Sequence, residues 1–167
     1  MKPNLLINVI GNCKSGKSET WLCLFEKKVK TGCYERKLFY PNNEFIKVFL
    51  INGSPEERNI PVKDIIGDQN PRIVLCSIQY IKEAVATFEY FINNNYHLYC
   101  HWLNPGYKDD NNIAQFDNLG FINFILSIES SNFSVKNGKS LPKSRVDEMA
   151  AFIYGWASHN NLVIKYH

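Results

Sequence analysis

Short apolar runs separated by polar segments predict five β-strands along the chain. Each run is bounded by Pro, Gly or Asn, which interrupt regular structure. The predicted strands cover residues 5–10, 45–51, 72–77, 96–103 and 162–166. Runs this short and this continuously apolar are typical of strands that are buried on both faces.

Three other segments have the apolar spacing of amphipathic helices, namely residues 18–29, 80–92 and 145–158. The first helix is expected to end near Gly32, because the lysines at its end suit a helix C-terminus. Residues 120–130 fit a helix or a strand equally well. Strands that alternate with helices predict an α/β fold in three layers, with a mostly parallel central sheet and helices on both faces.

The composition agrees with one folded domain over residues 1–167, of which 45% are apolar and 21% are charged. A net charge of only +3 argues against a protein that depends on nucleic-acid binding. No apolar run reaches the 18 or so residues that would span a bilayer, and the first residues do not resemble a signal peptide. We therefore expect a cytoplasmic protein without membrane association. Residues 104–145 are polar and basic, which suggests a lid or a partner-facing insertion.

The cysteines and histidines point to reduced thiols rather than to disulfides or a metal centre. The five cysteines form an odd number, and no two of them are two to four residues apart. His97, Cys100 and His101 lie close together in the sequence. On a strand, however, positions 97 and 101 share one face and position 100 points to the other, so the three cannot converge on one ion.

One segment carries a specific chemical signal. The sequence Gly11-Asn-Cys-Lys-Ser-Gly-Lys-Ser18 fits the pattern Gly-x4-Gly-Lys-[Ser/Thr] at every required position. It follows an apolar strand directly and opens an amphipathic helix, which is the structural context that this pattern requires. In this segment the chain resembles the P-loop (Walker A) NTPase superfamily.

The spacing of these residues has a physical reason. Gly11 and Gly16 let the backbone curl around a phosphate without a Cβ clash, so that the N–H groups of residues 13–18 form an anion nest. Lys17 can reach the terminal phosphates, and the Ser18 hydroxyl can ligate Mg²⁺. The expected cofactors are ATP and Mg²⁺. The loop residues expected to bind ATP are Gly11, Asn12, Cys13, Lys14, Ser15, Gly16, Lys17 and Ser18.

Many P-loop sites also have a carboxylate that ends an apolar strand and holds the Mg²⁺ shell. Glu129 is the candidate here, because residues 124–128 form an apolar run that ends in this acid. Glu56 and Glu57, which follow the second predicted strand, are alternatives. Ser77 or Gln79, at the end of the third predicted strand, could instead position water or a phosphate.

Guanine specificity is not indicated. Residues 64–67 and 117–120 each match Asp-x-x-Gly, but neither match directly follows a convincing strand. An Asn-Lys-x-Asp segment, which reads guanine in P-loop GTPases, does not occur in the sequence. The expected nucleotide is therefore ATP.

The order of predicted elements resembles that of small P-loop kinases, such as the gluconate, shikimate and nucleoside monophosphate kinases. In these kinases a lid after the fourth strand supplies basic groups that close on the phosphates. By position, Lys139, Lys143 and Arg145 are the candidates, with Arg145 and Lys17 as the expected catalytic residues. Alternatively, Arg145 pairs with Asp147 or Glu148 at the start of its helix. Neither an Arg-x-x-x-Arg lid nor an Asp-x-Asp acceptor site is present.

Two functions remain open at this point. The first is Mg²⁺-dependent phosphoryl transfer from ATP to a small molecule or nucleotide that the sequence does not identify. The second is an ATP-dependent switch or ATPase subunit of a larger assembly with a protein partner, which the missing acceptor residues and the aromatic content of 14% favour. Phosphorylation or processing of nucleic acid is a weaker third hypothesis, based on aromatic residues near a basic loop.

Overall fold

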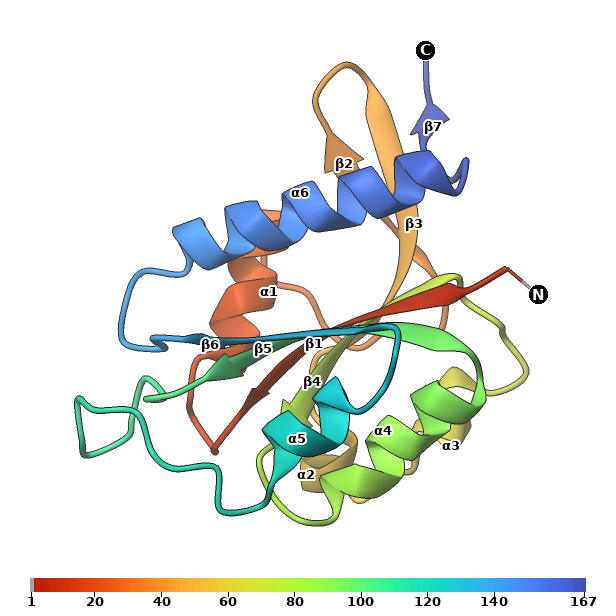
Figure 1. The fold of residues 1–167 in the computed structure, drawn as a ribbon. Helices are drawn as coiled ribbons and strands as arrows, with labels where there is room; N and C mark the ends of the chain where they lie inside the picture. The colour runs from red at the N-terminus through yellow and green to blue at the C-terminus, as the bar shows by residue number, and fades with distance from the viewer. Residues whose placement is uncertain (1) are drawn as a thin grey trace.

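The computed structural model describes residues 2–167 and has a seven-stranded sheet at its centre (Figure 1). The strands are β1 Asn4–Gly11, β2 Arg36–Tyr40, β3 Glu44–Ile51, β4 Ile73–Gln79, β5 Tyr96–Leu103, β6 Ser131–Lys136 and β7 Ile164–Lys165. The helices are α1 Lys17–Phe25, α2 Pro55–Arg58, α3 Val62–Ile66, α4 Ala84–Asn93, α5 Phe121–Leu126 and α6 Lys143–His159. Within these described residues, no helix is both long and apolar enough to cross a membrane.

The sheet has the order β2-β3-β4-β1-β5-β6, and β7 pairs with β3 outside this path. The pairs β3–β4, β4–β1, β1–β5 and β5–β6 are parallel, whereas β2 and β7 run antiparallel to β3. The predicted α/β class with a mostly parallel sheet is therefore confirmed. Five parallel strands end at the same edge of the sheet, so the loops that follow them come together there.

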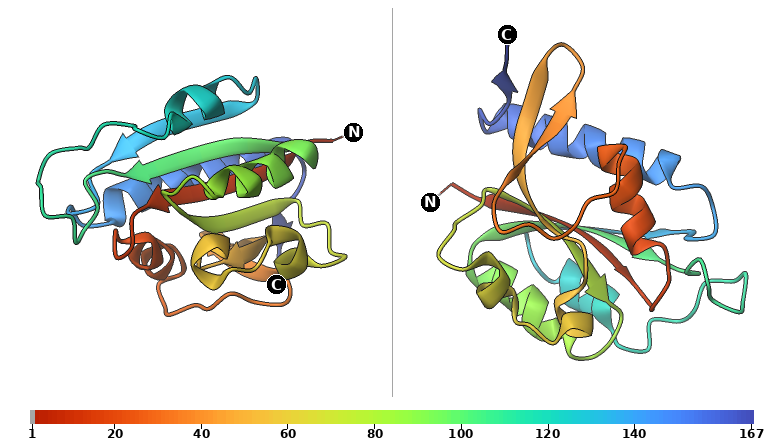
Figure 2. Two further views of the ribbon diagram at one scale, coloured as in Figure 1. Left: turned by 90° about the horizontal axis from the view of Figure 1, so that it is seen from below. Right: turned by 180° about the vertical axis from the view of Figure 1, so that it is seen from behind.

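Helices α1 and α6 lie on one side of the sheet and α2 to α5 on the other (Figures 1 and 2). The alternation of side chains along β5 reflects this arrangement. Tyr99 and Leu103 pack into the cluster that includes α1 and α6 residues, whereas Cys100 and Trp102 pack into the cluster that includes α4 and α5 residues. Cys100 thus points away from the face that carries His101, as the strand pattern predicts.

Several element boundaries differ from the predictions for local physical reasons. Helix α1 ends at Phe25, because Glu26 has a left-handed φ of 56° and its N–H bonds back to the Cys23 carbonyl. The lysines at 27, 28 and 30 therefore lie beyond the helix and not in its last turn. The ambiguous segment 120–130 forms the helix α5, whose first N–H groups are accepted by the Asp117 carboxylate.

The segment 104–145 is not one continuous lid. It contains α5 and β6, and β6 is a full strand of the sheet paired with β5. What remains are two loops: the β5–α5 loop (residues 104–120) and the β6–α6 loop (residues 137–142). The strand β6 was missed because its sequence, Ser131-Asn-Phe-Ser-Val-Lys136, is too polar for a buried strand. Such a polar sequence is typical of a strand at the edge of a sheet.

Candidate functional site

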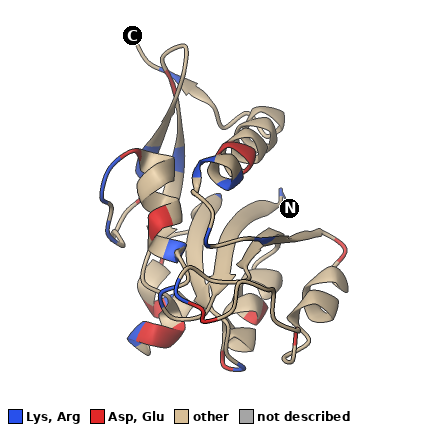
Figure 3. Cartoon of the chain, turned by 90° about the vertical axis from the view of Figure 1, so that its left-hand side faces the viewer, with Lys and Arg blue, Asp and Glu red and all other residues tan. Residues whose placement is uncertain are grey.

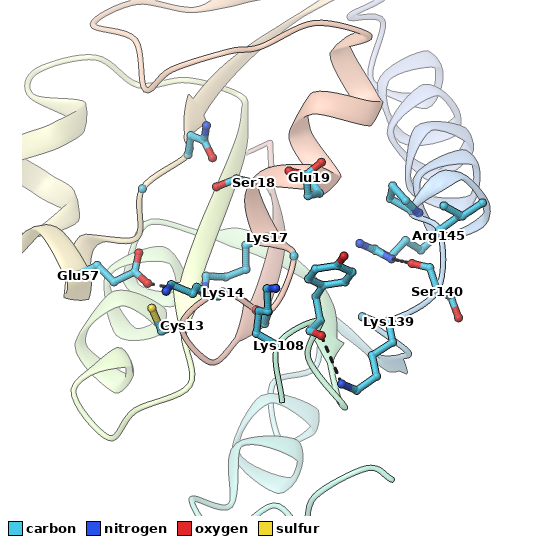
Figure 4. Close-up of a pocket in the computed structure, with 18 residues that line it drawn as sticks. Cys13, Lys14, Lys17, Ser18, Glu19, Glu57, Lys108, Lys139, Ser140 and Arg145 are labelled. Carbon is cyan, nitrogen blue, oxygen red and sulfur yellow. Dashed lines mark hydrogen bonds and ion pairs between the residues drawn. The ribbon is translucent and has the colours of Figure 1, made fainter. Parts of the chain in front are cut away.

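A pocket of about 720 Å³ opens at the edge where the parallel strands end (Figure 4). Its walls are the predicted glycine loop (residues 11–18, after β1), the turn after β3, the two loops that follow β5 and β6, and the start of α6. Crevices beyond the carboxyl ends of parallel strands are the usual ligand sites of open α/β sheets. The fold thus places the segment with the specific sequence signal in the position where a ligand site is expected.

The glycines of the loop are required by its geometry. Gly16 has a φ of +104°, which side chains rarely tolerate. Ser15 is fully buried, and a Cβ on Gly11 would lie only 2.2 Å from its Oγ atom. A Cβ on Gly106, in the β5–α5 loop, would lie 2.7 Å from the Ser15 Cβ atom. Ser15 therefore fills a space that exists only because Gly11, in the same loop, and the distant Gly106 are both glycine.

Both neighbouring loops hold the glycine loop from outside. The Tyr107 N–H donates to the Ser15 carbonyl at 2.9 Å, and the Lys108 N–H donates to the Lys14 carbonyl at 3.2 Å. Gly138 packs so closely that a Cβ there would lie 2.7 Å from the Ser15 carbonyl oxygen. The shape of the glycine loop consequently depends on residues about ninety and more positions further along the chain.

Lys17 is the first of two buried cations in the pocket. Its side chain is largely buried, and Nζ donates to the carbonyls of Gly11 at 3.0 Å and Asn12 at 2.7 Å. Burial lowers the pKa of Lys17, and this effect is opposed by the Glu57 carboxylate, whose Oε1 lies 3.9 Å from Nζ. The ammonium is thus held at the loop by neutral oxygens, and among residues 2–167 the partly exposed Glu57 is the carboxylate within ion-pair distance of it.

Arg145 is the second buried cation, with only 4% of its surface exposed. Its guanidinium donates to the Thr20 hydroxyl and, through Nη1, to the Ser140 carbonyl at 3.3 Å. It forms no ion pair with a carboxylate among residues 2–167, because Asp147 pairs with Lys143 and Glu148 pairs with Lys136. Figure 4 shows Arg145 at the pocket wall opposite Glu57.

The two other basic candidates have different roles. Lys139 Nζ donates to the carbonyls of Tyr107 and Asp109, so this side chain ties the β6–α6 loop to the β5–α5 loop. Lys143 is exposed and pairs with Asp147 one turn along α6. Of the three basic residues proposed for a lid, only Arg145 lies at the pocket as a buried group without an acidic partner.

The structure does not bring Glu129 to the pocket. This residue lies two positions before the first residue of β6, and β6 runs parallel to β5 and β1, so the start of β6 lies at the sheet edge opposite the glycine loop. Glu129 is therefore excluded as a ligand at this site. Glu57 lines the pocket instead, together with the exposed Ser18. Glu56 turns away and accepts hydrogen bonds from the Gln79 N–H and the Thr87 hydroxyl.

The remaining sequence candidates have structural explanations. Ser77 is buried and accepts a hydrogen bond from the indole N–H of Trp21 at 2.8 Å. Asp117 caps α5 and also accepts the Tyr80 hydroxyl at 2.6 Å, which accounts for one of the two Asp-x-x-Gly matches. Asp64, in the other match, lies in α3 outside the pocket.

Other lining residues were missed in the sequence, namely Asn52, Gly53, Tyr107 and Leu141. Each one follows the end of a parallel strand by a few residues, and that position is the signal that could have found them. The lining is predominantly basic, as the blue segments near this edge in Figure 3 illustrate. Its cations are Lys14, Lys17, Lys108, Lys139 and Arg145, against the acids Glu19 and Glu57.

Among residues 2–167, no group of three or more His, Cys, Asp and Glu side chains is arranged to hold a metal ion. Comparisons with protein-family models, with curated proteins and with solved structures found no match for this chain.

Proposed function

We propose that this protein belongs with the P-loop nucleotide-binding proteins, binds ATP in the pocket at the glycine loop and transfers its terminal phosphoryl group in a Mg²⁺-dependent reaction. The observation that carries the proposal is the pair of buried cations, Lys17 and Arg145, which line the same pocket. Burying a cation without a compensating anion is unfavourable by several kcal/mol. Arg145 has no carboxylate partner among residues 2–167, and Lys17 has the partly exposed Glu57 at 3.9 Å. A polyanionic ligand in the pocket would supply negative charge to both.

The shape and charge of the pocket also fit such a ligand. Its volume of about 720 Å³ lies in the range typical of sites that hold a cofactor-sized molecule. The loop N–H groups at the start of α1 add a site for a negatively charged group. Tyr107 and Leu141, with exposed fractions of 56% and 85%, offer an aromatic and an apolar surface beside the loop for the nucleoside.

Each residue of the candidate site has a distinct role in this proposal. The glycine loop binds the phosphates through main-chain N–H groups, and Lys17 can exchange its carbonyl partners for phosphate oxygens. Arg145 stabilises the negative charge of the phosphates from the opposite wall. Ser18 would be the protein ligand for Mg²⁺, and Glu57, which lines the same pocket, would orient water near it. When bound, Mg²⁺ would neutralise charge on the transferred group.

The proposal is tested by measuring binding and turnover separately. Isothermal titration of the full chain with ATP, ADP and AMP in the presence of Mg²⁺ should show affinity that increases with the number of phosphates. ATP labelled at the γ-phosphate then reports transfer to a panel of metabolites and nucleotides, or release to water. If ATP and AMP bind equally well, or if neither binds, the phosphate-binding assignment is wrong.

A second candidate function is supported by the surface next to the pocket. The β5–α5 loop exposes 78% of Ile113 and 89% of Phe116, and the same loop contributes Tyr107 to the pocket. An exposed apolar loop that continues into a nucleotide site suits an ATP-dependent switch or ATPase subunit that signals to a protein partner. Tight ATP binding with negligible turnover by the isolated chain would favour this second function.

A further inference from the structure

We infer that Thr20 is a positioning residue that holds the Arg145 guanidinium against the glycine loop. This inference rests on the proposed function, and it adds a residue outside the sequence pattern to the site. Thr20 lies in α1, two positions after Ser18, and is fully buried. Its side chain faces α6, the helix that carries Arg145.

The hydroxyl of Thr20 uses both its donor and its acceptor capacity. It donates to the Gly16 carbonyl at 3.0 Å and accepts from Arg145 Nε at 3.3 Å and Nη2 at 3.4 Å. One oxygen atom thus connects the backbone of the glycine loop to the guanidinium. Since Gly16 has a φ of +104°, this connection is made at a loop position whose backbone conformation favours glycine.

The connection also decides where the charge of Arg145 lies. The guanidinium has no carboxylate partner among residues 2–167, so its direction depends on Thr20 and on the Ser140 carbonyl. Ser140 is in the β6–α6 loop, whereas Thr20 is in the core beneath the glycine loop. Nη2 is 3.5 Å from the position of a Cβ on Gly16, so the group that Thr20 holds directly adjoins the proposed phosphate site.

A double-mutant cycle on the full chain tests this role. The variants are Thr20→Val, which keeps the shape without the hydroxyl, Thr20→Ser, which keeps the hydroxyl, Arg145→Met, and Thr20→Val combined with Arg145→Met. The measured quantity is the dissociation constant of ATP with Mg²⁺, and urea unfolding confirms that each variant is folded. A hydrogen bond to a charged group is worth enough for Thr20→Val to weaken binding about 10-fold, whereas Thr20→Ser should stay within about 3-fold of the unmodified chain.

The cycle separates positioning from simple packing. If Thr20 acts through Arg145, Thr20→Val should have no further effect in the Arg145→Met background. An equal loss in both backgrounds, or unchanged ATP affinity of folded Thr20→Val, would overturn the inference while leaving the proposed function intact. If the unmodified chain binds neither ATP nor inorganic triphosphate, the proposed function fails first, and this inference fails with it.

Discussion

The packing of Gly138 against the glycine loop leads to a prediction that joins stability to ligand binding. Gly138→Ala adds a single methyl group at a position where there is no room. The new Cβ would lie 2.7 Å from the Ser15 carbonyl oxygen, 2.9 Å from the Pro105 carbonyl oxygen and 3.1 Å from the Gly106 Cα atom. All three are backbone atoms, so they cannot move aside by rotating a side chain.

The expected magnitude follows from this geometry. Forcing an extra methyl group into a packed site typically costs about 1–3 kcal/mol. In a chain of this length that destabilisation corresponds to a melting temperature lowered by roughly 2–10 °C. Relief is possible only if the β6–α6 loop moves away from the glycine loop. We therefore expect ATP affinity to fall together with stability.

Thermal unfolding with and without Mg²⁺-ATP measures both effects in the same experiment. Gly155→Ala is the matched control, because Gly155 lies within α6 and a Cβ there would meet nothing within 4 Å. This control should gain about 0.5–1 kcal/mol from the higher helix propensity of alanine. If Gly138→Ala melts like the unmodified chain and binds ATP equally well, the close packing of the two loops is refuted.

Three further predictions concern charge and capping. Lys17→Met should weaken ATP binding roughly a thousand-fold, because it removes the attraction between a buried ammonium and phosphate at an effective dielectric of about 20. Titration calorimetry measures this affinity, and the control Lys27→Met, which removes an exposed charge, should leave it nearly unchanged. Burial, assisted by nearby Lys136, lowers the pKa of His101 to about 4. As the pH falls from 7 to 5, this histidine therefore stays neutral in the folded chain and becomes protonated in the unfolded chain. Urea unfolding should show stability falling by about 2 kcal/mol between pH 7 and pH 5, and a His101→Gln variant with the same pH dependence would contradict this. Asp117→Ala should lower the free energy of unfolding by about 1–2 kcal/mol through loss of the α5 cap, whereas a similar loss for the exposed Asp110→Ala would show that the cap is not the cause.

The sequence predicted the parts of the fold that depend on local patterns. Apolar runs gave β1, β3, β4 and β5, because strands in the middle of a parallel sheet are apolar on both faces. The strands β2 and β6 were not predicted, since both lie at the edges of the sheet and carry polar residues. Their identity as strands depends on a neighbour that the local sequence does not reveal.

The candidate site divides in the same way. The glycine loop was predicted because its spacing is a local requirement of its backbone. Arg145 was one of three basic candidates chosen by their position after the fourth predicted strand, where the resembled kinases have a lid. Glu129 was misplaced because the apolar run before it belongs largely to the helix α5 and not to a strand, so Glu129 precedes β6 and does not follow a strand. The choice between Glu56 and Glu57 was settled only by the packing of α2, and Thr20 became visible only once α6 was packed against the loop.

The contacts of Ser15 also bear on how far the octapeptide Gly11–Ser18 can act alone. The buried Ser15 side chain packs against Gly106. The Ser15 carbonyl accepts a hydrogen bond from the Tyr107 N–H and packs against Gly138. A fragment truncated before the fifth strand would retain every letter of the sequence pattern while losing the three residues that shape it. Transplanting the octapeptide into another scaffold should fail for the same reason, unless the glycines at 106 and 138 are supplied with it.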